Sequence, residues 1–437
     1  MKHHRVLVAL GLIAALASLE ACSKRGEHKK PRSEASQQSP DRADDKATRA
    51  KDQAAPTGPP EKVLLWHAYR DDERKALDKL IAAWNEKNPQ VQVTALAIPF
   101  DAYVDKIQVA VPRDNGPDLL IFAHDKIGSW ARDGLIEPLG AWASPARLRR
   151  FLPQTVKPLV FERAVYGLPL AFKSLVLFYN KAMVATPPKT MVDLISIAKE
   201  HTNAAESRFG LAYDATDLYQ HAAFMHAYGA TTYDDARGEL AIDTPAAVAA
   251  LSAVRDLHKK HGILPKGVQG FVITGMFNDG SVPMVFNGPW FSSEIDDAID
   301  WGVAVLPTAQ NGKPLRPYLG SEALMLNARS KVRGAALRVV DYLTSDEAAL
   351  TRLKMGKQLV ANARVYENPR WAADPVIRIF RAQADVAVPM SNAVEANVAW
   401  QPYSSALSKA VFGDSDVQDA LSAAASEATA ALTKLKR

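Results

Sequence analysis

Three consecutive polar residues, His124, Asp125 and Lys126, follow the apolar run 119–123. An apolar run bounded by polar residues predicts a short strand that is buried on both faces of a parallel sheet. Ligands in open α/β sheets bind beyond the carboxyl ends of the strands, so we expect this polar group to face a ligand. In the alternative reading, Asp125 only caps a helix that extends to Arg132.

The elements around this group alternate between strands and helices. Strands are predicted over residues 63–66, 91–98, 119–123, 165–171, 175–179 and 209–213, and helices over 73–88, 102–110, from about 189 to 201, and over 414–437. This alternation predicts an α/β fold with a parallel sheet and helices on both faces. A second α/β unit starts with the strand at 165–171.

Motifs of catalysis and metal binding are absent from the sequence. It has no G-x-S-x-G elbow, no phosphate-binding glycine loop, no H-E-x-x-H motif and no cysteine pair. His221 and His226 are five residues apart in a predicted helix, so they point to different faces and we interpret them as structural. We therefore expect no catalytic residues, no metal and no cofactor.

Three separated motifs resemble the family 1 extracellular solute-binding proteins of ABC transporters, in particular the maltose/maltodextrin-binding proteins. They are GPDLLIFAHDKIGSWARDGL at 116–135, PLAFKSLVLFYN at 169–180 and FNGPW at 286–290. The resemblance covers about residues 62–435. It implies a periplasmic-binding-protein-like fold of two interleaved α/β lobes joined by a hinge, with a ligand cleft between them. The implied first lobe is 62–172 plus 323–370, and the second is 173–322 plus 371–437.

The resemblance also implies a sugar site of polar groups and flat aromatic rings. Asp125 and Lys126 match the polar pair that binds sugar hydroxyls, and Trp290 and Trp400 match the aromatics on which sugar rings stack. In the alternative readings both tryptophans are core residues and Tyr219 lies at the surface. The implied ligand-binding residues are Tyr69, Asp71, Phe122, Asp125, Lys126, Lys173, Asp217, Tyr219, Trp290 and Trp400.

The chain departs from the family pattern in its polar residues. Lys173 stands where the family has a glutamate, and Ser404 stands where it has an arginine. Maltodextrin is therefore the leading expectation for a di- or oligosaccharide ligand, while an acidic sugar or another anionic solute remains open because of Lys126 and Lys173. A carbohydrate-active hydrolase that uses two carboxylates is the competing class of function.

The N-terminal region resembles that of an exported lipoprotein. Residues 1–21 have the basic start and short apolar run of a signal peptide, and LEAC resembles a lipobox that ends at Cys22. Cys22 is the single cysteine, and we expect it to carry the lipid anchor; the alternative is a soluble exported protein with an inert thiol. Residues 22–61 are polar and rich in charge, which predicts a disordered tether.

Charge and resemblance define the expected partners. Residues 61–437 hold 42 basic and 41 acidic side chains and so carry a net charge of +1, which does not indicate nucleic-acid binding. The resemblance implies a monomer, exported and anchored at the periplasmic or cell-surface face of a membrane. Its two lobes would close around the sugar and deliver it to an ABC permease in the inner membrane.

Overall fold

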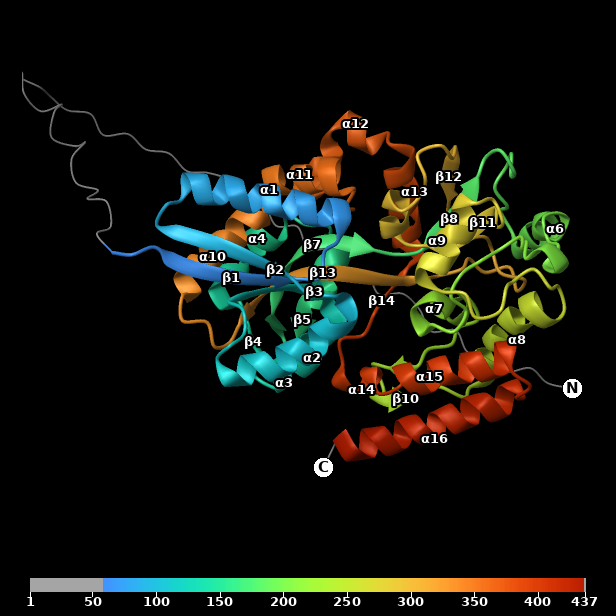
Figure 1. Cartoon of the computed structure of the whole chain (residues 1–437). Helices are drawn as coiled ribbons and strands as arrows, with labels where there is room; N and C mark the ends of the chain where they lie inside the picture. Colours follow the sequence, from blue (N-terminus) through green and yellow to red (C-terminus); the bar gives the residue numbers. More distant parts are fainter. Residues whose placement is uncertain (1–57, 436–437) are drawn as a thin grey trace, which may run out of the picture. The chain divides into compact units, whose positions relative to one another are not determined.

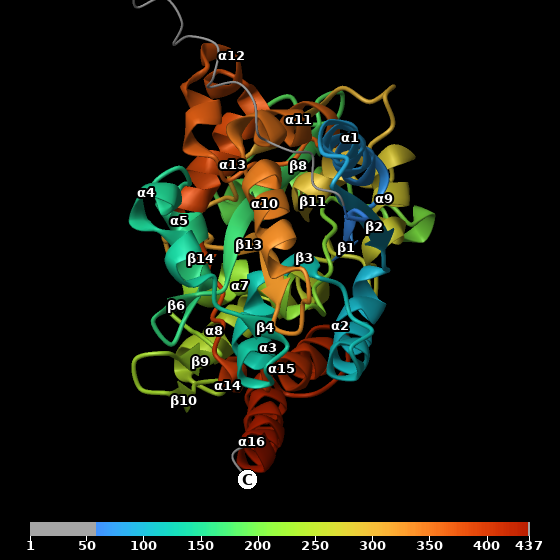
Figure 2. The ribbon, with the colours of Figure 1, turned by 90° about the vertical axis from the view of Figure 1, so that its left-hand side faces the viewer.

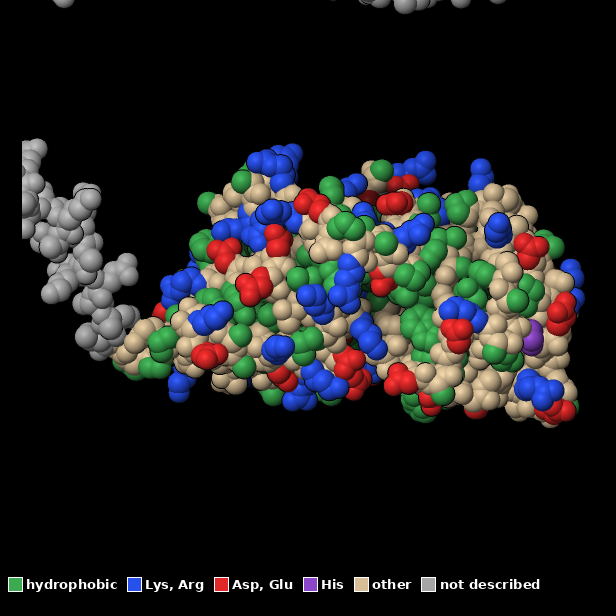
Figure 3. Space-filling model, turned by 90° about the horizontal axis from the view of Figure 1, so that it is seen from above, with side chains coloured by type: hydrophobic (Ala, Val, Ile, Leu, Met, Phe, Trp, Pro, Cys, Tyr) green, Lys and Arg blue, Asp and Glu red, His purple; other side chains and the backbone are tan. Residues whose placement is uncertain are grey.

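The computed structural model describes residues 58–435, which belong to one compact unit. The expectations for the signal peptide at 1–21, for Cys22 and for most of the tether lie outside these residues. No helix within 58–435 is both long enough and apolar enough to span a bilayer. The face shown in Figure 3 carries interspersed basic and acidic side chains, in line with the small net charge of this part of the chain.

A seven-stranded sheet forms one half of this unit. Its strands are β1 (Glu61–His67), β2 (Val91–Ala97), β3 (Leu119–Ala123), β4 (Ile136–Glu137), β7 (Gly167–Lys173), β13 (Tyr318–Asn327) and β14 (Val388–Pro389). The order is β14-β13-β3-β1-β2, and β4 and β7 also pair with β13. β1 is parallel to β2 and β3, as predicted, but β13 runs antiparallel to β3 and β7. The sheet is therefore mixed rather than parallel throughout.

Helices cover both faces of this sheet (Figure 1). α1 (Asp71–Lys87), α10 (Arg333–Leu343) and α11 (Asp346–Gly356) lie on one face, and α2 (Phe100–Ala110) and α3 (Ile127–Arg132) lie on the other. Leu77, Leu80, Ile81 and Trp84 recur at helical spacing and form the buried side of α1. Each face of the sheet thus has its own hydrophobic core.

The second sheet has three antiparallel strands. They are β8 (Val176–Asn180), β11 (Met284–Asn287) and β12 (Trp301–Ala304), in the order β11-β8-β12. The helices of this region include α6 (Met191–Glu200), α7 (Leu218–Ala227), α8 (Pro245–Lys259) and α9 (Gly270–Asn278). Thr190 and Asp193 cap α6 reciprocally, which explains why this helix begins where it does.

The strand predicted at 209–213 is not formed. Only Ala212 pairs with β11, as a single bridge to Val285. The backbone N–H groups of Phe209 and Leu211 donate instead to the carbonyls of Ser281 and Ile263, so no continuous ladder develops. The apolar run is buried by tertiary packing, which a pattern of apolar residues alone does not distinguish from a strand.

The C-terminal segments complete the unit (Figure 2). They are α12 (Pro369–Ala372), α13 (Pro375–Val386), α14 (Val394–Asn397), α15 (Trp400–Leu407) and α16 (Val417–Leu435). α16 packs on α15 and α8, and Asp416 caps its start by accepting from the N–H of Gln418 at 2.8 Å. Short elements fill the connections: α4 (Pro145–Leu148), α5 (Pro153–Val156), β5 (Val160–Phe161), β6 (Ala164–Val165), β9 (Tyr233–Asp234) and β10 (Glu239–Leu240).

The chain passes repeatedly between the two sheets. It leaves the large sheet after β7, enters the small sheet at β8, and returns from β12 to the large sheet at β13. The architecture is that of two interleaved α/β lobes with a cleft between them, as the resemblance implied.

Candidate functional site

A cavity of about 540 Å³ collects nearly all of the expected ligand-binding residues. Both the large sheet and the elements around the small sheet contribute to its lining. Of the ten expected residues, nine line it: Tyr69, Phe122, Asp125, Lys126, Lys173, Asp217, Tyr219, Trp290 and Trp400.

The polar turn after β3 faces this cavity with Asp125 and Lys126. Their side chains form an ion pair of 2.7 Å, and Lys126 also donates to Asn397 Oδ1 at 3.4 Å. Asp125 does not cap the next helix, because the N-cap residue of α3 is Lys126 and its side chain makes no cap hydrogen bond. Asp125 is therefore held by its lysine partner, with its carboxylate at the cavity wall.

His124 has a structural position behind this pair. Its Nδ1 accepts the backbone N–H of Ser321 at 2.9 Å, which leaves Nε2–H to donate to the carbonyl of Met390 at 3.0 Å. Burial lowers the pKa of His124 and keeps the ring neutral. His124 thus ties the end of β3 to β13 and to the segment after β14.

A cluster of charges lies at the end of β7. Lys173 Nζ is 3.2 Å from Glu322 and 3.7 Å from Glu73, and the hydroxyl of Tyr69 donates to Glu322 at 2.6 Å. Burial opposes the charged form of Lys173, but the two carboxylates outweigh it and raise its pKa above the ordinary value. Burial also raises the pKa of Glu73, and its neighbour Lys173 opposes that rise.

Sequence reasoning missed both carboxylates of this cluster. Glu322 carried a usable signal, because it is the one charged residue in the otherwise uncharged run 318–327. A lone charge in a buried strand needs a partner, and here that partner is Lys173. Glu73 had no such signal, since acidic residues are common in the first turn of a helix.

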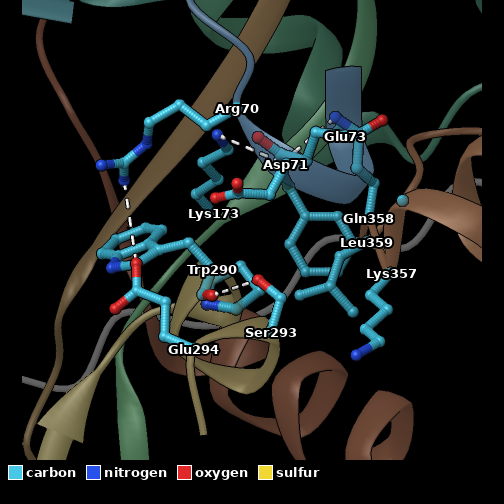
Figure 4. A pocket seen from close by; sticks show the side chains of 14 residues that line it. Arg70, Asp71, Glu73, Lys173, Trp290, Ser293, Glu294, Lys357, Gln358 and Leu359 are labelled. Carbon is cyan, nitrogen blue, oxygen red and sulfur yellow. Dashed lines mark hydrogen bonds and ion pairs between the residues drawn. The ribbon is translucent and has the colours of Figure 1, made fainter. Parts of the chain in front are cut away.

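Asp71 is the one expected residue outside the main cavity. It lies in a smaller neighbouring cavity of about 30 Å³, which shares Arg70, Glu73, Lys173 and Trp290 with the larger one (Figure 4). Asp71 is exposed, and its backbone takes a positive φ of 42° where α1 begins. In the same small cavity Arg70 approaches Glu294 at 3.8 Å.

Four aromatic rings form a continuous row. Trp290 lies 6.4 Å from Tyr219, which lies 6.2 Å from Tyr318, and Tyr318 stacks at 6.2 Å on Trp400. Both tryptophans are partly buried against the core and also line the cavity, so core packing and cavity lining coexist here. Tyr318, which belongs to the row, was not anticipated from the sequence.

Gly288 allows the indole of Trp290 to lie against the backbone. A Cβ at Gly288 would be only 2.2 Å from atoms of that ring. The N-G-P-W sequence therefore positions the tryptophan through a close approach that only glycine permits.

Asp217 and Tyr219 stand at the start of α7. Asp217 is the N-cap residue and accepts the N–H of Tyr219 at 3.1 Å. Burial raises the pKa of Asp217 to about 6. Tyr219 is not a surface residue: its hydroxyl is buried and, among residues 58–435, has no hydrogen-bond partner.

Metal binding finds no support in this part of the chain. Within the described residues there is no group of three or more His, Cys, Asp or Glu side chains that could hold a metal ion. His221 and His226 are both buried in α7, and His226 Nδ1 is bonded to the carbonyl of Arg316 at 2.8 Å.

The charged residues around the cavity are mostly acidic. Three basic side chains (Arg70, Lys126 and Lys173) and five acidic ones (Glu73, Asp101, Asp125, Asp217 and Glu322) line it, a formal balance of −2. Because Lys126 and Lys173 are both paired with carboxylates, neither offers a free cation to a ligand.

Two α/β lobes around a cleft that holds aromatic and paired polar side chains define a two-lobe solute-binding protein. Residues 68–350 match the family described as bacterial extracellular solute-binding protein, and the chain belongs to this family. Its relatives include the maltotriose-binding protein of Pyrococcus abyssi, 26% identical over 78% of this chain and 75% of that protein. The galactooligosaccharide-binding protein of Bacillus subtilis is 26% identical over 84% of this chain and 88% of that protein.

Solved structures agree with this assignment of the fold. The maltotriose-binding protein of Thermus thermophilus, bound with maltotriose, has a TM-score of 0.78 and 27% identity, over 85% of this chain and 100% of that one. A cyclo/maltodextrin-binding protein complexed with maltotetraose has a TM-score of 0.75 and 26% identity, over 88% of this chain and 100% of that one.

Proposed function

We propose that this protein is the substrate-binding lipoprotein of an ABC sugar importer and captures a neutral di- or oligosaccharide, with maltodextrin favoured. The observation that carries the proposal is that three rings of the aromatic row, those of Trp290, Tyr219 and Trp400, line the cavity that also holds paired polar groups. Sugars present C–H groups on their faces and hydroxyls at their edges, so stacked rings and carboxylates suit the two kinds of surface. The names of the relatives, which concern maltotriose and galactooligosaccharide, support the same class of ligand.

Eight of the nine expected residues at the cavity are proposed as ligand contacts; Phe122 is left out because its side chain is only 3% exposed. The unpartnered hydroxyl of Tyr219 supports this role, because a buried polar group without a partner costs free energy that a ligand hydroxyl can recover. Asp125 and Asp217 are proposed as acceptors of sugar hydroxyls. Asp71 is proposed only as a neighbour of the site.

An anionic ligand is disfavoured by the charges. The cavity lining has a balance of −2, and both lysines that suggested an acidic sugar are already paired. Bringing a carboxylate sugar here would place like charges together in a partly desolvated site. A uronic-acid oligosaccharide should therefore bind more weakly than its neutral counterpart.

Transport would proceed by lobe closure. We propose lobes of residues 62–172 plus 323–370 and of 173–322 plus 371–437, with a hinge where the chain crosses between them. A ligand that contacts both lobes favours the closed form by those additional contacts. The closed form would dock on a permease in the inner membrane, while Cys22 anchors the protein on the membrane surface.

Isothermal titration calorimetry on the purified full chain tests the proposal. Maltotriose, a galactooligosaccharide and a uronic-acid oligosaccharide are compared, and the recovered sugar is examined for cleavage. Micromolar or tighter binding of a neutral sugar that is recovered intact is expected. Cleavage of the sugar would favour the hydrolase instead, and binding of the acidic sugar alone would overturn the proposed ligand class.

A further inference from the structure

Phe122, one of the ligand-binding residues that the resemblance implied, has little free surface. Its side chain is only 3% exposed. Tyr103 stacks on it at 4.5 Å with an interplanar angle of 10°, and Trp130 lies 5.7 Å away. A ring covered in this way supports the wall, but it has no open face on which a sugar could lie.

Phe100 supplies the open aromatic surface that Phe122 lacks. It is the first residue of α2, it stacks on Phe122 at 4.9 Å and 25°, and it lines the same cavity. Its side chain is 60% exposed, so most of the ring is in contact with solvent. Single exposed aromatics are common on protein surfaces, but this one is held in orientation by a stack of buried rings at the cavity edge.

The position of Phe100 complements the aromatic row. Trp290 and Trp400 come from the elements around the small sheet, whereas Phe100 comes from a helix that covers the large sheet. A ligand with two apolar faces could therefore contact rings from both lobes. Asp101, next in the chain, also lines the cavity and places an acceptor beside the ring.

We infer that Phe100 is the stacking residue of the large-sheet lobe and makes the ligand contact that the resemblance implied for Phe122. Its ligand is the apolar face of a neutral sugar ring, so this inference rests on the proposed function. Because Phe100 belongs to one lobe and the tryptophans to the other, its contact also contributes to the preference for the closed form.

Calorimetric titration of maltotriose and maltotetraose into four variants tests this role. Phe100→Ala should weaken binding about fivefold, equivalent to roughly 1 kcal/mol, while Phe100→Trp should bind within about twofold of the natural protein. Phe271→Ala is the matched control, because Phe271 is 87% exposed on α9 and does not line the cavity. Phe122→Leu should lower the midpoint of urea unfolding with little effect on affinity.

The possible outcomes separate the two proposals. Unchanged affinity in Phe100→Ala, together with strong loss in Trp290→Ala, would overturn the role of Phe100 and leave the proposed function standing. Failure of the natural protein to bind any neutral oligosaccharide would overturn both. If residue 100 touches the sugar, ligand binding should change the tryptophan fluorescence of Phe100→Trp more than it changes the tryptophan fluorescence of the natural protein.

Discussion

The ammonium of Lys173 lies 3.2 Å from Glu322, and this ion pair joins the last residue of β7 to β13. Glu73 on α1 approaches the same ammonium at 3.7 Å. Lys173 therefore does not make this wall basic, since two carboxylates face a single positive charge. Lys173, which stands where the resemblance implies a glutamate, is accommodated by acidic neighbours, and the cavity keeps its acidic character.

Removal of Lys173 should destabilise the fold. Lys173→Gln leaves Glu73 and Glu322 close together without their cation, and about 2 kcal/mol should be lost from the free energy of unfolding. Urea denaturation measures this change. Lys181→Gln is the control, because the Lys181–Asp300 pair is exposed and its loss should leave the free energy of unfolding little changed. Equal effects of the two substitutions would contradict the importance of the Lys173 cluster.

Trp290→Ala should weaken binding of a neutral oligosaccharide by about 2 kcal/mol or more, a typical value for a central aromatic contact. This corresponds to roughly a 30-fold loss of affinity. Trp371→Ala is the control, because Trp371 is also partly buried but does not line the cavity. Unchanged sugar affinity in Trp290→Ala would remove Trp290 from the site.

Asp217 should make stability depend on pH. Burial raises the pKa of Asp217 from 3.8 to about 6 in the folded state, so the protonated carboxyl group favours the fold. Its contribution to the free energy of unfolding is fully present below about pH 4 and is lost as the pH rises through 6. Asp217→Asn should therefore be more stable than the natural protein at pH 8, by about 1 to 3 kcal/mol, and similar to it near pH 4. Asparagine retains the capping function.

Thermal unfolding of Asp217→Asn at pH 4, 6 and 8 measures this difference. Asp416→Asn is a matched control, because Asp416 is also a helix-capping carboxylate but is exposed. A stability difference that is the same at every pH in Asp217→Asn would show that burial of this carboxylate has no energetic consequence.

Gly128→Ala should disturb the contact between α3 and the segment after β14. A Cβ at Gly128 would lie 1.9 Å from the carbonyl oxygen of Asn392, so the backbone must shift. We expect a loss of about 1 to 3 kcal/mol in unfolding free energy. Gly334→Ala, at an exposed position in α10 with open space around the new methyl group, should instead be neutral or slightly stabilising. Urea denaturation compares the two, and equal stability of both variants would exclude a rigid contact at Gly128.

Much of the fold was predictable from local pattern. β3 begins and ends at the predicted residues, and the apolar stripe of α1 from Leu77 to Trp84 is buried as its spacing indicated. The prediction of a strand at 209–213 was wrong, because a segment buried by tertiary packing and a strand buried in a sheet have the same apolar run in the sequence. β13 pairs antiparallel with β3, although the paired residues are about 200 positions apart in the chain. No local sequence pattern predicts such a pairing.

The sequence by itself determined the alternation of strands and helices, the near-neutral charge of residues 61–437 and, through three motifs, the family and nine of the residues that line the cavity. Only the tertiary structure decided which side chains neutralise one another and which rings remain open. Lys173 and Phe122 show why: a side chain's charge and size are encoded locally, but its free charge and free surface depend on the neighbours that folding brings to it. Glu322 and Phe100 are those neighbours.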